Sequence, residues 1–181
     1  LLSTQPAQPA ASASASARDQ SGELRRDLAV AASGREGGPL PPIRLGRTLA
    51  NGTTRIETIP VDDYIAQVLA GEGQPRAGDG AQQALAVTAR TFAMANRNRH
   101  RREGFDLCDT THCQVVRTAT ATTARAAQAT SGRVLLSQGQ PAFVFYSASC
   151  GGRTEAASAV WPGAIDYAGG ASVRDDADEH E

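Results

Sequence analysis

The sequence predicts an α+β fold, in which mixed helices and short antiparallel strands form a single domain with a substrate groove. The first observation is a hairpin signal, since the alternating segments Pro41 to Leu49 and Arg55 to Pro60 flank Asn51-Gly52. The second is a pair of segments with helical apolar spacing after the hairpin. The third is another pair of strand-like segments around Gly139. Helices that lie between pairs of strands indicate a mixed class.

The first predicted helix follows the hairpin directly. Asp62 or Asp63 is expected to cap its N-terminus, because a short acidic side chain can accept hydrogen bonds from the first backbone amides. Gly71 and Gly73 are expected to end it. Its apolar face carries Ile65, Val68 and Leu69.

A second, longer helix is expected from about Ala81 to Arg97, with Asp79 as its cap. Alanines beside its apolar stripe would let a neighbouring element approach closely. The stripe and these alanines are Leu85, Thr88 and Phe92, with Ala81, Ala84 and Ala95. The charged segment from Arg97 to Arg102 is expected to be a solvated helix end and loop.

The last predicted elements are a short helix and two strands. The helix runs from Thr122 or Thr123 to Thr130, and Gly132 is its expected stop. The strands span Arg133 to Leu136 and Ala142 to Tyr146.

The ends of the chain differ in composition from the middle. Residues 1–39 are rich in Ala, Ser, Pro and Gln at their start, so we expect a disordered or linker segment that follows an export signal or anchor. Residues 172–181 are strongly acidic, and we expect a solvated tail or the truncated end of the domain.

The composition of the 181-residue chain excludes several classes of protein. Because 18 Lys and Arg residues balance 19 Asp and Glu residues, for a net charge of -1, we expect no nucleic-acid partner. No run approaches the about 20 apolar residues that span a bilayer, so we expect membrane attachment only through an N-terminal anchor. Every basic residue is Arg, which excludes Schiff-base chemistry on a lysine. Three cysteines cannot all pair within one chain.

Glu72 is the first candidate for chemistry. If the first helix continues to this position, the carboxyl group lies on the apolar face, and glycines on both sides leave room for a bulky ligand. A carboxyl held against apolar groups has its charged form disfavoured, which suits a general acid. The alternative is a glutamate at a helix end that points to solvent.

The segment from Cys108 to Cys113 is the second candidate. Cys108, His112 and Cys113 offer three soft ligands from one tight loop, which suits Zn²⁺, and His100 is a candidate fourth ligand. The alternatives are a disulfide between the two cysteines or free buried thiols.

The segment from Tyr146 to Glu155 is the third candidate. Ser147, Ser149 and Cys150 are nucleophiles by type, but a nucleophile needs a base within reach, and the chain has only 3 histidines. A polar turn that lines a groove is therefore the favoured interpretation. Cys150 is also a candidate to pair with a loop cysteine or to remain a small buried thiol.

Taken together, these segments resemble one family of bacterial proteins. Five motifs occur in its order: Asp63-Tyr64-Ile65 to Gly71-Glu72, Ala84 to Ala93, Cys108 to Gln114, Tyr146 to Glu155, and Val160-Trp161. The chain is similar to the domain shared by stage II sporulation protein D and the LytB amidase-enhancer proteins. The resemblance covers residues 40–171, which we expect to form a SpoIID/LytB-like domain.

The resemblance implies a peptidoglycan lytic transglycosylase, a lyase that cuts glycan strands denuded of stem peptides and leaves a 1,6-anhydro-muramyl end. The family's catalytic glutamate maps onto Glu72, acting first as acid and then as base. Its metal site maps onto Cys108, His112 and Cys113, with a structural zinc. Val116 stands where the family commonly has a tyrosine that could contact a sugar.

The resemblance also implies partners and a location. Candidates for substrate binding are Arg90, Gln114, Tyr146, Ser147 and Thr154, and Arg90 can instead pair with a carboxylate or hold a loop. The expected partners are peptidoglycan glycan strands and, for LytB-type relatives, a cell-wall amidase. The expected location is extracytoplasmic: periplasm, cell wall or secreted. Two alternatives remain open, a non-catalytic peptidoglycan-binding enhancer of an amidase and a thiol or redox protein.

Overall fold

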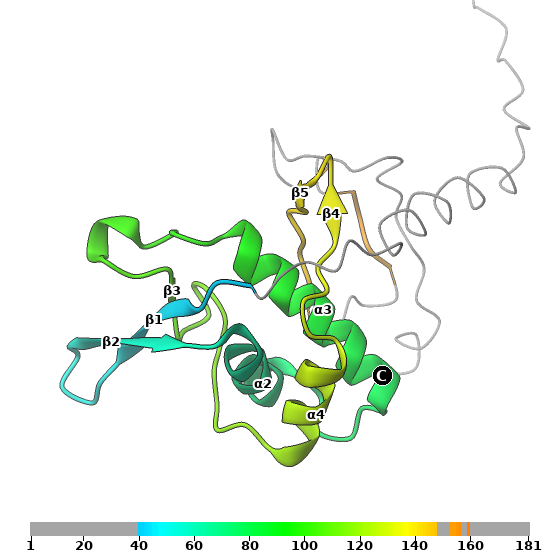
Figure 1. The fold of residues 1–181 in the computed structure, drawn as a ribbon, viewed down its shortest axis with the longest axis horizontal. Helices are drawn as coiled ribbons and strands as arrows, with labels where there is room; N and C mark the ends of the chain where they lie inside the picture. The colour runs from blue at the N-terminus through cyan, green and yellow to red at the C-terminus, as the bar shows by residue number, and fades with distance from the viewer. Residues whose placement is uncertain (1–39, 148–152, 157–158, 160–181) are drawn as a thin grey trace, which may run out of the picture. The chain divides into compact units, whose positions relative to one another are not determined.

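The computed structural model describes residues 40–147, 153–156 and 159 (Figure 1). The expected segment 1–39, the acidic end 172–181, Ser149, Cys150 and the Val160-Trp161 motif lie outside the described residues. In chain order the elements are β1 Ile43–Thr48, β2 Thr54–Ile59, α2 Val61–Glu72, α3 Asp79–Ala95, the 3-10 helix η1 Arg101–Glu103, β3 Leu107–Cys108, α4 Ala121–Ala129, β4 Leu136–Ser137 and β5 Gln140–Pro141. Helices and short strands in small sheets confirm the predicted α+β class.

The predicted hairpin is confirmed. β1 and β2 pair antiparallel, with Ile43 opposite Ile59 at one end and Thr48 opposite Thr54 at the other. The connecting turn contains Gly52 at φ 80°, a backbone angle that glycine adopts without a steric cost. The hairpin therefore forms where the Asn-Gly dipeptide predicted it.

The third strand departs from the predicted antiparallel pairing. β3 lies parallel to β1, with Leu45 opposite Leu107 and Gly46 opposite Cys108, so the sheet order is β2-β1-β3. Parallel pairing requires a long crossover, which here contains α2 and α3. Local sequence patterns do not reveal such a non-local pair. Its consequence is that Cys108 is fixed at one edge of the sheet.

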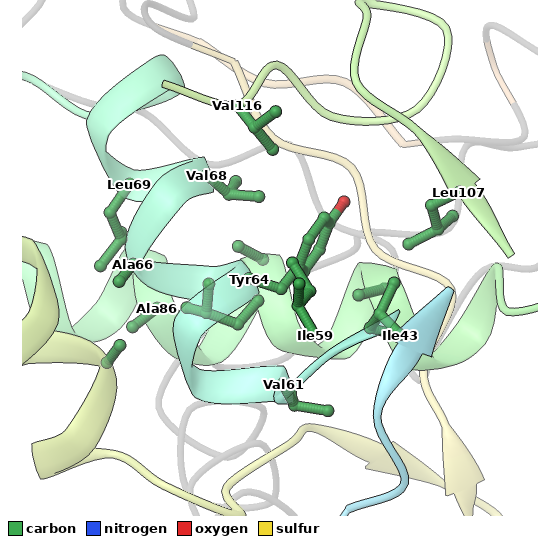
Figure 2. Close-up of a cluster of buried hydrophobic side chains, with 14 of the residues drawn as sticks. Ile43, Ile59, Val61, Tyr64, Ala66, Val68, Leu69, Ala86, Leu107 and Val116 are labelled. Carbon is green, nitrogen blue, oxygen red and sulfur yellow. The ribbon is translucent and has the colours of Figure 1, made fainter. Parts of the chain in front are cut away.

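α2 forms the centre of the core (Figure 2). Tyr64, Ile65, Val68 and Leu69 are each no more than 1% exposed, and Figure 2 shows the Tyr64 ring between the helix and the side chains of the sheet. α2 packs against both α3 and α4. The predicted apolar face is confirmed.

The expected cap of the first helix is wrong by two or three positions, and that of the second helix by one. α2 begins at Val61, after Pro60, and α3 begins at Asp79, after Gly78. Asp62 and Asp79 therefore lie in first turns, where a negative charge still stabilises the positive end of a helix. The Asp62 carboxylate instead accepts hydrogen bonds from Arg90 and Ser131.

The buried face of α3 also differs from the predicted stripe. The fully buried alanines are Ala86, Ala89 and Ala93, whereas Ala81 and Ala84 are exposed. The predicted stripe residues Leu85 and Phe92 are half-buried and line a pocket. Leu85 also packs against the core cluster, so the apolar stripe serves both the pocket and the core.

The last elements are confirmed in outline. α4 begins one residue before the earliest predicted start, and Thr120 and Thr123 cap it through reciprocal hydrogen bonds. Gly132 follows the helix at φ 71°. The predicted strands differ from those observed. β4 shares only Leu136 with the first predicted strand, and β5 ends before the predicted strand Ala142 to Tyr146, because pairing is confined to residues 136–141 around Gln138 and Gly139. No helix among the described residues has the length and apolar character needed to cross a membrane.

Candidate functional site

Glu72 lies at the end of α2, and its carboxylate does not point freely to solvent. The backbone amide of Val115 donates a hydrogen bond of 2.6 Å to Oε1. The hydroxyl group of Tyr146 donates a short hydrogen bond to Oε2. The side chain is half-buried and lines a pocket. Because both oxygens are held, the carboxylate has a fixed position and direction.

Gln114 connects this carboxylate to the core. Its Nε2 donates to the Ala89 carbonyl at 3.2 Å and to the Tyr146 hydroxyl at 2.7 Å, while its Oε1 accepts from the Tyr64 hydroxyl at 2.9 Å. A backbone carbonyl only accepts, so the contact with Ala89 fixes which end of the amide carries the hydrogens. The oxygen of Tyr146 then accepts from Gln114, which leaves its own proton for Glu72.

The two tyrosines of this chain of hydrogen bonds stay protonated at neutral pH. Burial raises the pKa of Tyr64 well above its usual range. Burial also raises the pKa of Tyr146, and the neighbouring Glu72 adds to this effect against an opposing contribution from Gln114. Tyr146 is therefore a hydrogen-bond donor to the carboxylate throughout the neutral range.

Gly71 allows the segment after Cys113 to lie directly against α2. A Cβ atom on Gly71 would stand 2.2 Å from the carbonyl oxygen of Val115, a distance that no side chain tolerates. The close approach brings the Val115 amide within reach of Glu72. The glycines beside Glu72 were expected to leave room for a bulky ligand. At Gly71 that space is occupied by the backbone of Val115.

The pocket beside Glu72 has a volume of about 730 Å³. Apolar side chains and polar groups both line it, which is typical of a site that orients a small molecule or one or two sugar rings. Five of its lining residues matter below: Glu72, Arg99, His112, Tyr146 and Ser147. The catalytic candidate and the cysteine loop therefore border the same cavity.

The candidates for substrate binding occupy different surroundings. Tyr146 and Ser147 line the pocket, and Ser147 is exposed. Gln114 is 1% exposed and acts through Tyr146. Thr154 is exposed and is not among the residues that line the pocket. Only Tyr146 and Ser147 are therefore placed to contact a ligand in this cavity.

Arg90 is completely buried and is not among the described residues that line the pocket. Its guanidinium group donates to Asp62 at 2.9 Å and to the carbonyl oxygens of Ala127 and Thr130, both at 2.8 Å. Burial lowers its pKa, and the contact with Asp62 opposes this. This placement fits the second expectation from sequence, a partner for a carboxylate, because Arg90 ties α3 to α2 and α4.

Val116, which stands where the family commonly has a tyrosine, packs in the core. Val116 is 6% exposed and belongs to the core cluster, close to Val68 in Figure 2. It is the neighbouring Val115 that lines the pocket. A valine in place of the family's tyrosine therefore removes no group from the pocket itself.

The structure brings together the four metal-ligand candidates. The ligand atoms of His100, Cys108, His112 and Cys113 all lie within 4.8 Å of one another. Nε2 of His100 lies 3.2 Å from Nδ1 of His112 and 3.3 Å from the Cys113 sulfur. Nδ1 of His112 lies 3.6 Å from each sulfur, and the two sulfurs lie 3.0 Å apart without a disulfide bond.

These atoms fit a tetrahedral zinc site. Zn–S bonds of about 2.3 Å and Zn–N bonds of about 2.0 Å place the ligand atoms of a tetrahedron about 3.3 to 3.8 Å apart. Four imidazole contacts, those of His112 with His100 and with both sulfurs and that of His100 with Cys113, lie within about 0.3 Å of that pattern. The sulfurs, at 3.0 Å, would separate to admit an ion, and His100 and Cys108, which lie within 4.8 Å of each other, would adjust to it. Two thiolates and two imidazoles are also the donor set that zinc prefers.

The surroundings of the cluster shift the pKa values of its two thiols in opposite directions and orient one of its imidazoles. Burial opposes ionisation of Cys108, but its hydrogen bonds with Cys113 and Thr110 outweigh burial and lower its pKa. Burial raises the pKa of Cys113 to about 12. On the far side of the His100 ring, Nδ1 lies 3.5 Å from a Glu103 oxygen, and the ring stacks on Phe105. A carboxylate behind a ligating histidine fixes the orientation of its ring.

The cysteine loop is fixed to the sheet and is continuous with the segment that holds Glu72. The Asp109 carboxylate accepts hydrogen bonds from the amide and hydroxyl of Thr48, at 3.1 and 3.0 Å. Cys113 is followed by Gln114 and Val115, the two residues that orient Tyr146 and Glu72. The position of the cysteine loop therefore helps to fix Glu72, because Val115 is only two residues after Cys113.

Two groups of this site had no signal in the sequence. The Val115 amide is a backbone group, and every residue has one, so its role depends on the fold alone. Tyr64 was assigned to a helix, but its hydroxyl group also completes the hydrogen-bond chain through Gln114. A buried tyrosine usually finds a partner for its hydroxyl, which is the only indication that could have pointed to it.

The fold and the site define an α+β domain in which a fixed glutamate and a cluster of two cysteines and two histidines border one pocket. Residues 50–136 match the family model of SpoIID, stage II sporulation protein. The resemblance to the SpoIID/LytB family is confirmed over these residues. The matched segment includes Glu72, all four residues of the cluster and Gln114. No curated protein matches the chain.

Proposed function

We propose that the protein is a peptidoglycan lytic transglycosylase with Glu72 as its acid and base. The SpoIID family match supports a cell-wall-related role in sporulation. The observation that carries the finer proposal is the Glu72 carboxylate, held by Val115 and Tyr146 at the wall of a pocket of about 730 Å³. A carboxyl group in a fixed direction is what proton transfer to a glycosidic oxygen requires.

The reaction needs one carboxyl group. Protonated Glu72 gives its proton to the oxygen of the glycosidic bond as the bond from that oxygen to C1 of the muramic acid breaks. The 6-hydroxyl oxygen of the same sugar then bonds to C1, and its proton passes to the Glu72 carboxylate. The products are a free 4-hydroxyl on one strand end and a 1,6-anhydro ring on the other. No water is consumed, and Glu72 returns to its starting state.

Tyr146 can stay bonded to Glu72 in both halves of this cycle. A hydroxyl group has one proton to donate and two lone pairs that accept. Tyr146 donates to Oε2 when Glu72 is ionised, and after rotation of its proton it can accept from the carboxylic acid. Gln114 keeps the tyrosine oxygen in place in either state, at 2.7 Å. Tyr146 is therefore a positioning residue for the glutamate.

Zinc in the cluster of His100, Cys108, His112 and Cys113 would supply structural order. The ion would stabilise the loop whose continuation supplies the Val115 amide, and no proton transfer depends on it. The proposed partners are peptidoglycan glycan strands, and the proposed location is extracytoplasmic, as the wall-directed family suggests.

The test compares wild-type protein with Glu72→Gln on denuded glycan strands. Wild-type protein is expected to release fragments with 1,6-anhydro ends, identified by mass spectrometry, and Glu72→Gln to release none. Asp63→Asn is the matched control, because Asp63 is an exposed carboxylate on the same helix. Glutamine keeps an oxygen for the Val115 amide, so the variant should fold. If both proteins bind glycan and neither cleaves it, the chain is a binding module of the enhancer type.

A further inference from the structure

Arg99 contributes a positive charge to the wall of the pocket that contains Glu72. Among the described lining residues it is the only arginine, and Glu72 is the only carboxylate. Arg99 is exposed, and it lies in the turns between α3 and η1. Asn98, directly before it, adopts φ 67°, a left-handed backbone angle that asparagine tolerates better than most residues. The chain thus turns sharply where it presents Arg99.

The guanidinium group of Arg99 has no carboxylate partner in the described part of the chain. Its one side-chain hydrogen bond goes to Oδ1 of Asn96, at 3.3 Å. By contrast, Arg44, Arg47 and Arg90 each form an ion pair with a carboxylate at 3.0 Å or less. Arg99 therefore keeps most of its five N–H donors for a ligand at the wall of the pocket.

Denuded glycan offers a matching group. Each N-acetylmuramic acid carries a lactyl group, which ends in a free carboxylate when the stem peptide has been removed. When the stem peptide is present, the same carbon belongs to a neutral amide. A guanidinium group binds a carboxylate through two parallel hydrogen bonds, and an amide can accept only one and carries no charge.

We propose that Arg99 binds the lactyl carboxylate of N-acetylmuramic acid and so selects glycan without stem peptides. This inference rests on the proposed function, because it names a specificity-determining residue for the same pocket. Arg99 also adds a positive charge to a wall whose one described carboxylate is Glu72, and a positive charge attracts a polyanionic strand. A strand with intact stem peptides loses this contact and brings a bulky chain to the same wall.

Arg99 also acts on Cys113, so the experiment must separate an effect on glycan binding from an effect on the cluster. Its positive charge favours the thiolate form of Cys113, one of the four residues of the cluster. A variant at this position could therefore lower glycan affinity by disturbing the cluster. Metal content and thermal stability must be measured beside affinity.

The experiment measures binding in a Glu72→Gln background, so that no strand is cut. The probes are fluorescent denuded glycan strands and the same strands with their lactyl carboxylates converted to methylamides. Arg99→Gln is expected to lower affinity for the denuded strands about tenfold and to leave affinity for the amidated strands unchanged. Arg99→Lys should retain part of the preference, because a lysine keeps the charge without the fork. Arg102→Gln, an exposed arginine of η1 outside the pocket lining, is the control and should match the background protein.

Three results would overturn the proposal. The first is equal affinity of the Arg99-containing protein for denuded and amidated strands. The second is an equal loss of affinity for both kinds of strand in Arg99→Gln, and the third is a loss of zinc or of thermal stability that accompanies the loss of affinity. The proposed function fails separately. If the Glu72-containing protein produces no anhydro ends while Arg99 still discriminates between the strands, cleavage is refuted and the carboxylate site stands. If cleavage occurs, Arg99→Gln should raise KM about tenfold for denuded strands at unchanged kcat.

Discussion

The carboxylate of Glu72 and the backbone amide of Val115 are joined by a hydrogen bond of 2.6 Å, which connects the end of α2 to the segment that follows Cys113. Through this bond, the segment that follows Cys113 helps to set the position of the Glu72 carboxylate, the candidate acid and base. It also explains why a glycine precedes Glu72, since the Val115 carbonyl would lie 2.2 Å from a Cβ atom at position 71. The geometry of the glutamate thus depends on close backbone contact.

Gly71→Ala should displace the segment around Val115 and disturb Glu72. The added methyl group meets a backbone oxygen, which cannot rotate away as a side chain can. We expect a loss of about 1 to 3 kcal/mol in the free energy of unfolding and at least a tenfold loss of glycan cleavage. Chemical denaturation and product release measure the two effects.

Gly80→Ala is the matched control for this substitution. Gly80 lies in the first turn of α3, with no atom within 4 Å of an added Cβ. Alanine restricts the unfolded chain more than glycine does, so this variant should be unchanged or more stable by up to about 1 kcal/mol. Wild-type stability and activity in Gly71→Ala would contradict the close packing described above.

Tyr146→Phe should weaken cleavage while the fold remains intact. The change removes the donor to Oε2 of Glu72 and leaves an amide hydrogen of Gln114 without its partner. We expect kcat to fall about 10- to 100-fold with little change in KM, because the tyrosine positions Glu72 more than it binds sugar. Ser147→Ala, a change at the neighbouring pocket residue, should act on KM instead. Unaltered kcat in Tyr146→Phe would show that Val115 alone orients the glutamate.

The sequence predicts the local features of this protein well. The hairpin at Asn51-Gly52, the buried face of α2 and the Glu72 position follow from patterns within short windows. The four residues of the cluster were also identified, because three of them lie within one loop and ligand chemistry limits the choice. His100 was the least certain member, since it reaches the cluster from the turn after α3.

The features that sequence did not predict depend on contacts between distant segments. The parallel pairing of β1 with β3 and the bond between Val115 and Glu72 have no local signature. The stripe of the second helix was predicted as one apolar face, because an apolar residue that lines a pocket has the same spacing as one that faces another helix. Arg90 was offered for substrate binding on the resemblance, and its burial becomes evident only when α2, α3 and α4 are assembled.

Stability should fall at alkaline pH because of the two buried tyrosines. Burial raises the folded-state pKa of both Tyr64 and Tyr146 above the value of an unfolded chain, about 10. Their contribution is therefore complete below pH of about 10 and is lost as pH rises toward the folded values. Each tyrosine should lower the free energy of unfolding by about 1.4 kcal/mol per pH unit in that range.

Urea unfolding from about pH 9 to about pH 11.5 measures this slope, because the lower limit lies below the ordinary tyrosine pKa of about 10. Tyr64→Phe and Tyr146→Phe should each remove about one tyrosine's share of it. Ultraviolet absorbance of tyrosinate should appear for these two residues only as the protein unfolds. A slope that is the same in wild-type protein and both variants would show that the two hydroxyls are not protected.

Removal of the proposed zinc ion should loosen the site before it affects the rest of the fold. The ligands on the 108–113 loop and His100 converge on one point, and the chain that leaves Cys113 supplies Gln114 and Val115 to the glutamate. Chelation, or Cys113→Ser, should therefore lower Tm and glycan affinity together, while α2 and its core remain folded. Hydrogen exchange should show faster exchange at the Val115 amide than at the α2 amides after chelation. Thr111→Ala, a non-ligand change in the same loop, should retain stoichiometric zinc and an unchanged Tm. A Cys113→Ser protein with unchanged Tm and affinity would refute the structural role of the ion.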